Sequence, residues 1–213
     1  MTSRLSWAPR ALLYALILIV FAGPFWAFLM TALSGVTIAP GRLLWWPEQP
    51  TLENFRYAWV EAQVWRYLLN SVIVVLVGTV LQLSVSAFAA YALARKRFRG
   101  LAAVSFLILS TMMLPDEVIA IPLFIVLGKL PLIGASLHDT HLGMILPVVG
   151  WGFSIFMLSE FMRAIPADLE EAARVDGASD WQIFWHVILP LCRPALGSAA
   201  VFGFIMIDRK SVV

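Results

Sequence analysis

The sequence predicts an all-α protein that crosses a membrane several times, and two observations support this fold class. Of the 213 residues, 61% are hydrophobic and only 13% are charged, whereas about 25% of the residues of a soluble domain are charged. Residues 11–41 and 67–94 contain no charged side chain. Because a helix needs about 20 apolar residues to cross the hydrocarbon of a bilayer, each of these runs is long enough to span it.

We expect a polytopic protein with four complete spans and the beginning of a fifth. The complete spans cover residues 11–33, 68–93, 101–127 and 142–161, and the partial span starts at Pro194. Arg4 and Arg10 precede the first apolar run, as in a signal peptide. That run is longer than the roughly 7 to 15 residues of a signal sequence, so we expect a retained helix.

The basic residues predict which side of the membrane each loop faces, because Lys and Arg favour the cytoplasm. With a cytoplasmic N-terminus, nine basic residues fall inside and four outside. Those inside are Arg4, Arg10, Arg95, Lys96, Arg97, Arg99, Arg163, Arg174 and Arg193. Those outside are Arg42, Arg56, Arg66 and Lys129. The bias predicts a cytoplasmic N-terminus.

Several function classes receive no support. The net charge of +2 is too small to indicate nucleic-acid binding. Cys192 is the single cysteine and cannot form an internal disulfide. His138, Asp139 and His141 are residue types that bind metals, but they lie in one short loop without a matching cluster elsewhere. We expect a polar loop there and no metal site.

The second span carries a face of mostly small residues at four-residue spacing. Gln82, Ser86, Ala90 and Ala94 make up this face. Small side chains let another helix approach closely. We expect the face to pack against other helices of the same chain.

The third span is interrupted by acids. Asp116 and Glu117 lie between two prolines in "MLPDEVIAIP", near the outer side of the bilayer. Ionisable residues at membrane depth indicate a cavity or pathway, which makes both residues substrate-pathway candidates. The alternative, that they mark a helix break at the wet outer interface, remains open.

Residues 170–190, "EEAARVDGASDWQIFWHVILP", cannot cross the membrane. Asp168, Glu170, Glu171, Arg174 and Asp176 are crowded together, and each charge costs about 2.5 to 3.5 kcal/mol at the centre of a span. We therefore expect a cytoplasmic loop.

The first half of this loop is expected to be a short helix. Pro166 suits its first turn, and Asp168, Glu170 and Glu171 favour the positive N-terminal end. Glu170 and Arg174 form a favourable pair four residues apart. Leu169, Ala172 and Ala173 are expected to form a narrow apolar face with the acids exposed. Gly177 is expected to end the helix.

The second half is expected to be another helix. Ser179 followed by Gln182 predicts a capping box at its start. Trp181, Phe184, Trp185 and Ile188 then form an amphipathic stripe. Pro190 and Pro194 break or kink the chain after this helix. Docking into another protein and packing on the chain itself both remain open for this loop.

The loop resembles the EAA loop of binding-protein-dependent ABC transporter permeases. The family pattern is E-A-A, three residues, G, nine residues, I, one residue, L-P. Here it is matched by Glu171, Ala172, Ala173, Gly177, Leu189 and Pro190, with Val187 in place of Ile. The segments "PTLENFRYAW", "NSVIVV", "FAAYALAR", "MMLP" and "LPLCRPAL" are similar to the carbohydrate-uptake branch.

The resemblance implies the fold of a type I ABC importer permease, truncated in the fifth of six helices. Residues 1–207 would form the permease domain. In the family this loop is a coupling helix that docks on a cytoplasmic ATPase. Carried over, Glu171, Ala172, Ala173 and Gly177 would contact or shape the ATPase cleft, and Asp176 would add a polar contact. Leu189 and Pro190 complete the motif.

The resemblance also implies the partners. These are cytoplasmic ATP-binding subunits, a second permease subunit and an extracytoplasmic solute-binding protein, in a bacterial inner membrane. The sequence has no phosphate-binding GxxxxGK[ST] loop. We therefore expect neither enzyme activity nor a cofactor in this chain. The substrate class implied is sugars, with glycerol phosphate or polyols as an alternative.

A carrier of another class remains an alternative: an ion-coupled secondary transporter that uses Asp116 and Glu117 as a cation site. It leaves the loop unexplained. The last residues, 208–213 ("DRKSVV"), are charged where the family has apolar sequence. A common sequencing adapter encodes these residues, so we expect a non-native tail.

Overall fold

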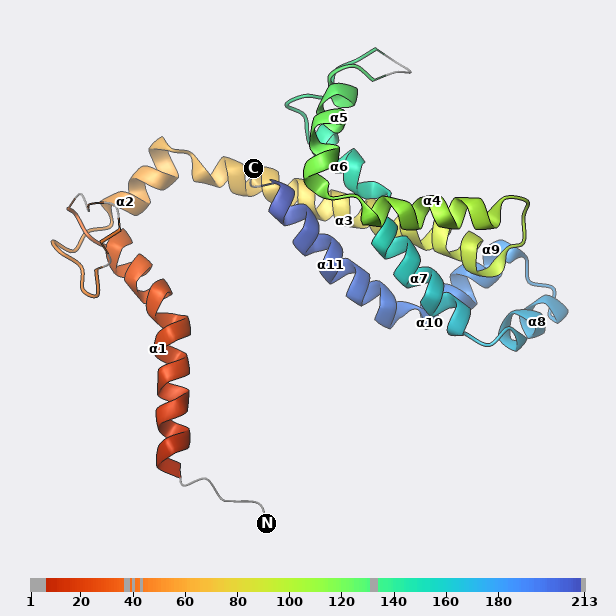
Figure 1. The fold of residues 1–213 in the computed structure, drawn as a ribbon, viewed down its shortest axis with the longest axis horizontal. Coiled ribbons are helices and arrows are strands. Elements are labelled where there is room, and N and C mark those ends of the chain that lie inside the picture. The colour runs from red at the N-terminus through yellow and green to blue at the C-terminus, as the bar shows by residue number, and fades with distance from the viewer. Residues whose placement is uncertain (1–6, 37–38, 40, 43, 131–133, 212–213) are drawn as a thin grey trace. The chain divides into compact units, whose positions relative to one another are not determined.

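The computed structural model describes residues 7–36, 39, 41–42, 44–130 and 134–211 (Figure 1). In this part of the chain the regular elements are helices, with an isolated β-bridge between Ser34 and Pro50. The chain divides into two compact units, residues 1–67 and 68–213. The predicted all-α fold is confirmed.

The first unit begins with α1 (Trp7–Ala32) and continues with α2 (Glu53–Arg56) and the π-helix η1 (Tyr57–Glu61). Polar contacts close the chain just after α1. The Ser34 hydroxyl donates to the Glu48 carbonyl (2.6 Å), and the Asn54 amide donates to the carbonyls of Ala32 and Ser34.

The second unit contains most of α3 (Val64–Arg95), followed by a series of shorter helices (Figure 1). These are α4 (Leu101–Met113), α5 (Asp116–Gly128), α6 (His141–Val149), α7 (Gly152–Ala164) and α8 (Asp168–Val175). After them come α9 (Asp180–Ile183), the π-helix η2 (Phe184–Ile188), α10 (Leu189–Leu191) and α11 (Arg193–Ser211).

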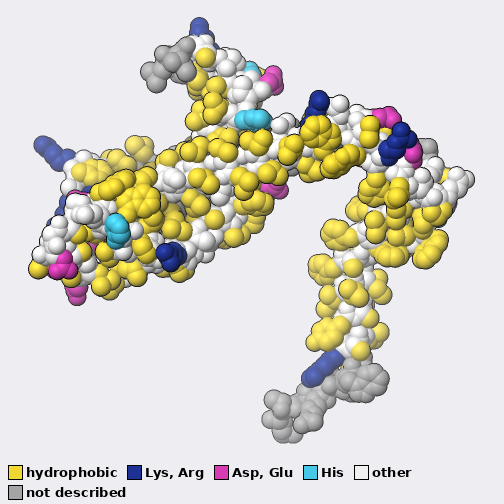
Figure 2. Space-filling view, turned by 180° about the vertical axis from the view of Figure 1, so that it is seen from behind, with side chains coloured by type: hydrophobic (Ala, Val, Ile, Leu, Met, Phe, Trp, Pro, Cys, Tyr) yellow, Lys and Arg dark blue, Asp and Glu magenta, His cyan; other side chains and the backbone are white. Residues whose placement is uncertain are grey.

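The predicted spans correspond to these helices. Three described segments, 9–32, 64–95 and 141–164, are long and apolar enough to cross a membrane, and there are up to five if each bent pair counts as one span. Hydrophobic side chains cover most of the visible surface of these helices (Figure 2). The predicted partial span from Pro194 is α11.

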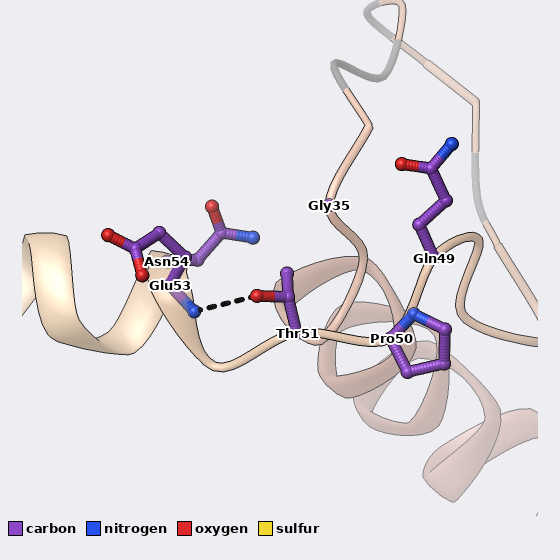
Figure 3. Close-up of a pocket in the computed structure, with 6 residues that line it drawn as sticks. All are labelled: Gly35, Gln49, Pro50, Thr51, Glu53 and Asn54. Carbon is purple, nitrogen blue, oxygen red and sulfur yellow. Dashed lines mark hydrogen bonds between the residues drawn. The ribbon is translucent and has the colours of Figure 1, made fainter.

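An open polar pocket lies in the first unit, beside the contacts that close the chain after α1. Gly35, Gln49, Pro50, Thr51, Glu53 and Asn54 line it. The Thr51 hydroxyl accepts from the Glu53 N–H at 3.1 Å (Figure 3). This bond fixes the start of α2 at the edge of the pocket.

The span expected at 101–127 is not one straight helix. Leu114 is extended (ψ 125°), and α4 and α5 are bent by more than 40° around it. The physical reason is Pro115, which disfavours a helical conformation at the residue before it. Asp116 then begins α5.

The core of the second unit joins α3 to α7 and to residues 180–199. Ala90, Leu158, Met162, Ile183 and Ile188 are all fully buried here. The small-residue face packs as expected, since Gln82, Ser86 and Ala90 are buried and Ala94 is half-buried.

One polar side chain of this face joins three helices. The Gln82 amide of α3 donates to the Ser154 hydroxyl of α7 and lies against Gly203 of α11. The absence of a side chain at Gly203 leaves room for the amide. The contact ties the last helix to the centre of the unit.

We expect Gly203→Ala to destabilise the second unit. A Cβ at this position would collide with the Gln82 side-chain oxygen, and overpacking of this kind costs about 1–3 kcal/mol. Thermal unfolding of the detergent-solubilised protein measures the loss. Gly197→Ala, on the same helix with nothing within 4 Å of the added Cβ, is the control. Equal stability of the two variants would contradict the packing described here.

Candidate functional site

The loop between α7 and α11 folds as helix, glycine corner and helix. α8 and α9 lie together at the end of the second unit where α7 ends (Figure 1). Gly177 has φ +84°, which only glycine adopts readily. Its N–H donates to the Arg174 carbonyl, and the Ala178 N–H donates to the Ala173 carbonyl. The predicted glycine stop is confirmed.

The start of the second helix is also as predicted. The Ser179 hydroxyl accepts from the Gln182 N–H, and the Gln182 side chain accepts from the Ser179 N–H at 2.8 Å. This reciprocal capping box satisfies two backbone donors that a helix start leaves unpaired. The direction of α9 after the corner is therefore set locally.

The prediction that all acids of α8 are exposed is wrong for Glu170. Its side chain is 6% exposed, and its Oε1 lies 2.8 Å from Nε of Arg95, at the end of α3. The reason is that the Glu170 side of α8 faces α3, and a buried carboxylate requires a cation beside it. The expected Glu170–Arg174 pair is present at 3.7 Å.

The expected narrow apolar face of α8 is divided. Ala173 is half-buried against the core, whereas Leu169 and Ala172 are exposed. The outward surface of the loop consists of Glu171, Ala172, Val175, Asp176 and Gly177. Val175 is 88% exposed. This surface combines two acids with small or apolar groups, a composition suited to contact with another protein.

Asp180 lies at the corner between cations from two elements. Its carboxylate is 2.5 Å from Nζ of Lys96, which follows α3, and 3.3 Å from the Arg174 guanidinium of α8. The hydrogen bond from Lys96 is the main reason that the pKa of this carboxyl lies below its ordinary value of 3.8. Arg174 acts in the same direction.

The aromatic stripe of the second helix is only partly buried. Phe184 and Ile188 are in the core, but Trp181 is 61% and Trp185 42% exposed. Both tryptophans instead pack on Phe88 of α3, with ring centroids 5.8 and 6.3 Å from the Phe88 ring.

Ile183 is fully buried, although it lies outside the predicted stripe. The physical reason is the π-helix at residues 184–188, which shifts the register of the helix faces. A pattern with 3.6 residues per turn therefore misassigns the faces of this segment.

The end of the motif supports the loop from within. Val187 and Leu189 are half-buried and pack against the core, and Pro190 is half-buried in α10. The chain bends by 75° between residues 180–191 and 193–209. This bend agrees with the predicted effect of the two prolines.

The other candidates lie apart from this loop in sequence and element. Glu117 is exposed in the first turn of α5, and the side chain of Asp116 is outside the described residues. His138 stacks on Phe124 and lies 2.9 Å from its carbonyl, and His141 contacts Asn70. Within the described residues no group of three potential ligands could hold a metal ion.

Residues 82–208 match the family described as the binding-protein-dependent transport system inner membrane component. The chain belongs to this family. The matched residues contain the whole α8–α9 loop, so this permease carries the family's EAA loop at the surface described above.

Individual relatives agree with the family match. The permease is 37% identical over 161 residues to the diacetylchitobiose uptake system permease protein NgcG of Streptomyces coelicolor, covering 75% of this chain and 52% of that protein. It is 36% identical over 161 residues to the alpha-glucoside transport system permease protein AglG of Rhizobium meliloti, covering 75% and 42%. The chain thus spans about half the length of these relatives.

A solved structure has the same fold. It is a chain from a bacterial ABC transporter involved in the import of the acidic polysaccharide alginate. The TM-score is 0.79 with 28% sequence identity, and the match covers 97% of this permease and 71% of that chain. The expected resemblance to ABC permeases and the multi-pass membrane architecture are confirmed.

We expect the corner of the loop to be insensitive to mild acid. Because the pKa of Asp180 is lowered on folding, its ion pairs contribute stability above the unfolded pKa and are lost only as the pH falls through the lower folded pKa. Amide-exchange protection factors of residues 179–183 should therefore be equal at pH 7 and pH 5.

The matched variant is Asp180→Asn, which removes the charge at every pH. It should show reduced protection at pH 7 and no further change at pH 5. A fall in wild-type protection between pH 7 and pH 5 would contradict the assignment.

Proposed function

We propose that this chain is a transmembrane permease subunit of an ATP-driven importer of sugars or oligosaccharides. ATP hydrolysis takes place in a separate cytoplasmic subunit, on which the α8–α9 loop docks. The observation that carries the proposal is the outward surface of this loop, in a chain that belongs to the binding-protein-dependent permease family.

The geometry of α8 suits a docking helix. Its eight residues make an element about 12 Å long, short enough to enter a cleft as one unit. Ala172 has little bulk, so a partner's surface can approach the backbone. Glu171 and Asp176 offer carboxylates to cationic side chains, and Val175 offers an apolar contact that is exposed in this chain alone.

Gly177 keeps this surface free of a side chain at the corner. Nothing lies within 4 Å of a Cβ added there, so a larger residue would not collide with the permease itself. It would instead occupy the space that a docked partner needs, and the positive φ would be strained. Residues 171–173, 176 and 177 therefore form the docking surface, and Leu189 and Pro190 hold its second helix.

The remaining parts of the transporter are those of the family. A second permease subunit would complete the transmembrane pathway, and an extracytoplasmic binding protein would deliver the substrate. Nine of the basic residues lie on one side of the expected topology, which favours a cytoplasmic N-terminus and a cytoplasmic loop.

The substrate class comes from the relatives. The two permeases compared above are those of a diacetylchitobiose and an alpha-glucoside system, and the solved structure is that of an alginate importer. All three names refer to saccharides, which favours a sugar or oligosaccharide over glycerol phosphate or another polyol. An ion-coupled carrier would leave the docking surface without a role.

We expect purified permease to capture the ATPase of its transporter, and Gly177→Asp or Glu171→Lys to abolish the capture. Each change alters the outward surface by a bulky or inverted charge. Losing roughly 2 kcal/mol at a central contact weakens binding about 30-fold. Co-purification of the tagged permease with the ATPase measures the effect.

Glu61→Lys is the matched control, since Glu61 is exposed and belongs to the first unit. It should capture the ATPase as the wild type does. Normal capture by both loop variants would exclude this surface as the docking site. Failure of the wild type to capture any ATPase would favour a carrier without one.

We also propose Asp116 and Glu117 as residues of the substrate pathway. The double change Asp116→Asn with Glu117→Gln should lower ATP-dependent uptake of a labelled oligosaccharide into proteoliposomes, with ATPase capture unchanged. A permease with normal uptake would instead place the two acids at a wet helix break beside Pro115, outside the pathway.

A further inference from the structure

The α8 helix is attached to the rest of the permease by few buried groups for an element that has to transmit force. Among its residues Glu170 is the buried one, and Ala173 is half-buried against the core. An alanine side chain buries little apolar area. The position of α8 therefore depends mainly on the partners of Glu170.

Those partners come from the end of α3. Arg95 lies 2.8 Å from the Glu170 carboxylate and also donates from Nη2 to the carbonyl of Ile165 at 2.6 Å. One guanidinium thus holds both the chain that leaves α7 and the first turn of α8. The side chains of Arg95 and Glu170 are 10% and 6% exposed, so solvent screens this pair weakly.

The second helix of the loop is held by the next residue of the same segment. Lys96 pairs with Asp180 at 2.5 Å, and Arg174 bridges Asp180 to Glu170 at 3.3 and 3.7 Å. Charges of alternating sign therefore run from Arg95 through Glu170, Arg174 and Asp180 back to Lys96. We call these five residues the charge ring.

The contact at the centre of the charge ring is tolerant of direction. Nε of Arg95 and Oε1 of Glu170 are close, but neither atom has an aligned hydrogen bond. A Coulomb attraction depends on separation far more than on angle, whereas a hydrogen bond weakens steeply when bent. The pair can therefore persist while α8 tilts.

We propose that Arg95 and Lys96 are positioning residues that fasten the loop to α3 through Glu170 and Asp180, so that α3 moves together with α8. This inference rests on the proposed function, since the ATPase supplies the displacement. It gives two of the basic residues counted as topology signals a mechanical role. Arg97 and Arg99 are exposed and take no part in the charge ring.

The length of α3 determines how far the displacement reaches into the transmembrane part. Its 32 residues extend about 48 Å, and its face of Gln82, Ser86 and Ala90 packs on the core helices. A displacement received at Arg95 is thus carried along a rigid helix through the packed interior.

The test measures the distance between spin labels at Ser84→Cys on α3 and Val175→Cys on α8, with Cys192→Ala, in nanodiscs. Both labelled positions are exposed. Without partners, the wild type should give one narrow distance distribution. Arg95→Gln and Glu170→Gln should broaden it roughly twofold, because α8 then samples several positions. Arg97→Gln, from the same basic segment, and Arg95→Lys, which keeps the charge, should leave it narrow.

The second arm uses the complex with the captured ATPase. Adding ATP and vanadate should leave the wild-type distance unchanged, since α3 and α8 move as one body, and should shift it in Glu170→Gln. A narrow distribution in Glu170→Gln, or a nucleotide-dependent distance in the wild type, would overturn the proposal. Absence of captured ATPase would overturn the proposed function, while the first arm would still decide whether the ion pair holds α8.

Discussion

The close packing of α3 on its neighbours is the constraint on which the rest of the second unit depends. Ala90 has no exposed surface, and Leu158, Met162 and Ile188 from later segments are equally enclosed. Side chains as small as alanine and serine let these helices approach until their backbones nearly touch. Only at this separation can Arg95 reach the start of α8 and Phe88 reach the tryptophans after the corner. The docking surface is therefore placed by contacts made inside the membrane part.

Local chemistry was sufficient to predict the form of the loop. The glycine corner at Gly177 and the capping box of Ser179 and Gln182 involve residues within a few positions of each other. The long apolar runs likewise predicted the spanning helices, because hydrocarbon admits little else. The family resemblance added the role of the loop, which no periodicity contains.

Other features could not be predicted because they depend on residues far apart in the sequence or on small changes of helix geometry. Glu170 looked like one more exposed acid, and its partner Arg95 looked like a topology signal. Their pairing exists only after α3 and α8 are brought together. The exposure of Trp181 and the burial of Ile183 result from the π-helix, which leaves no mark in a 3.6-residue pattern. The break at Leu114 was visible in principle, through Pro115.

The π-helix also bears on how this loop can change in length. Each residue of an α-helix advances the chain by about 100° around its axis. Deleting one residue from 184–188 would restore an ordinary helical turn, yet it would rotate everything after it by that angle. Ala195 and Ala199, now enclosed in the core, would then point elsewhere. The fixed spacing between the glycine corner and the Leu-Pro end of the motif is thus a phase condition, because it keeps the last helix in register with the interior.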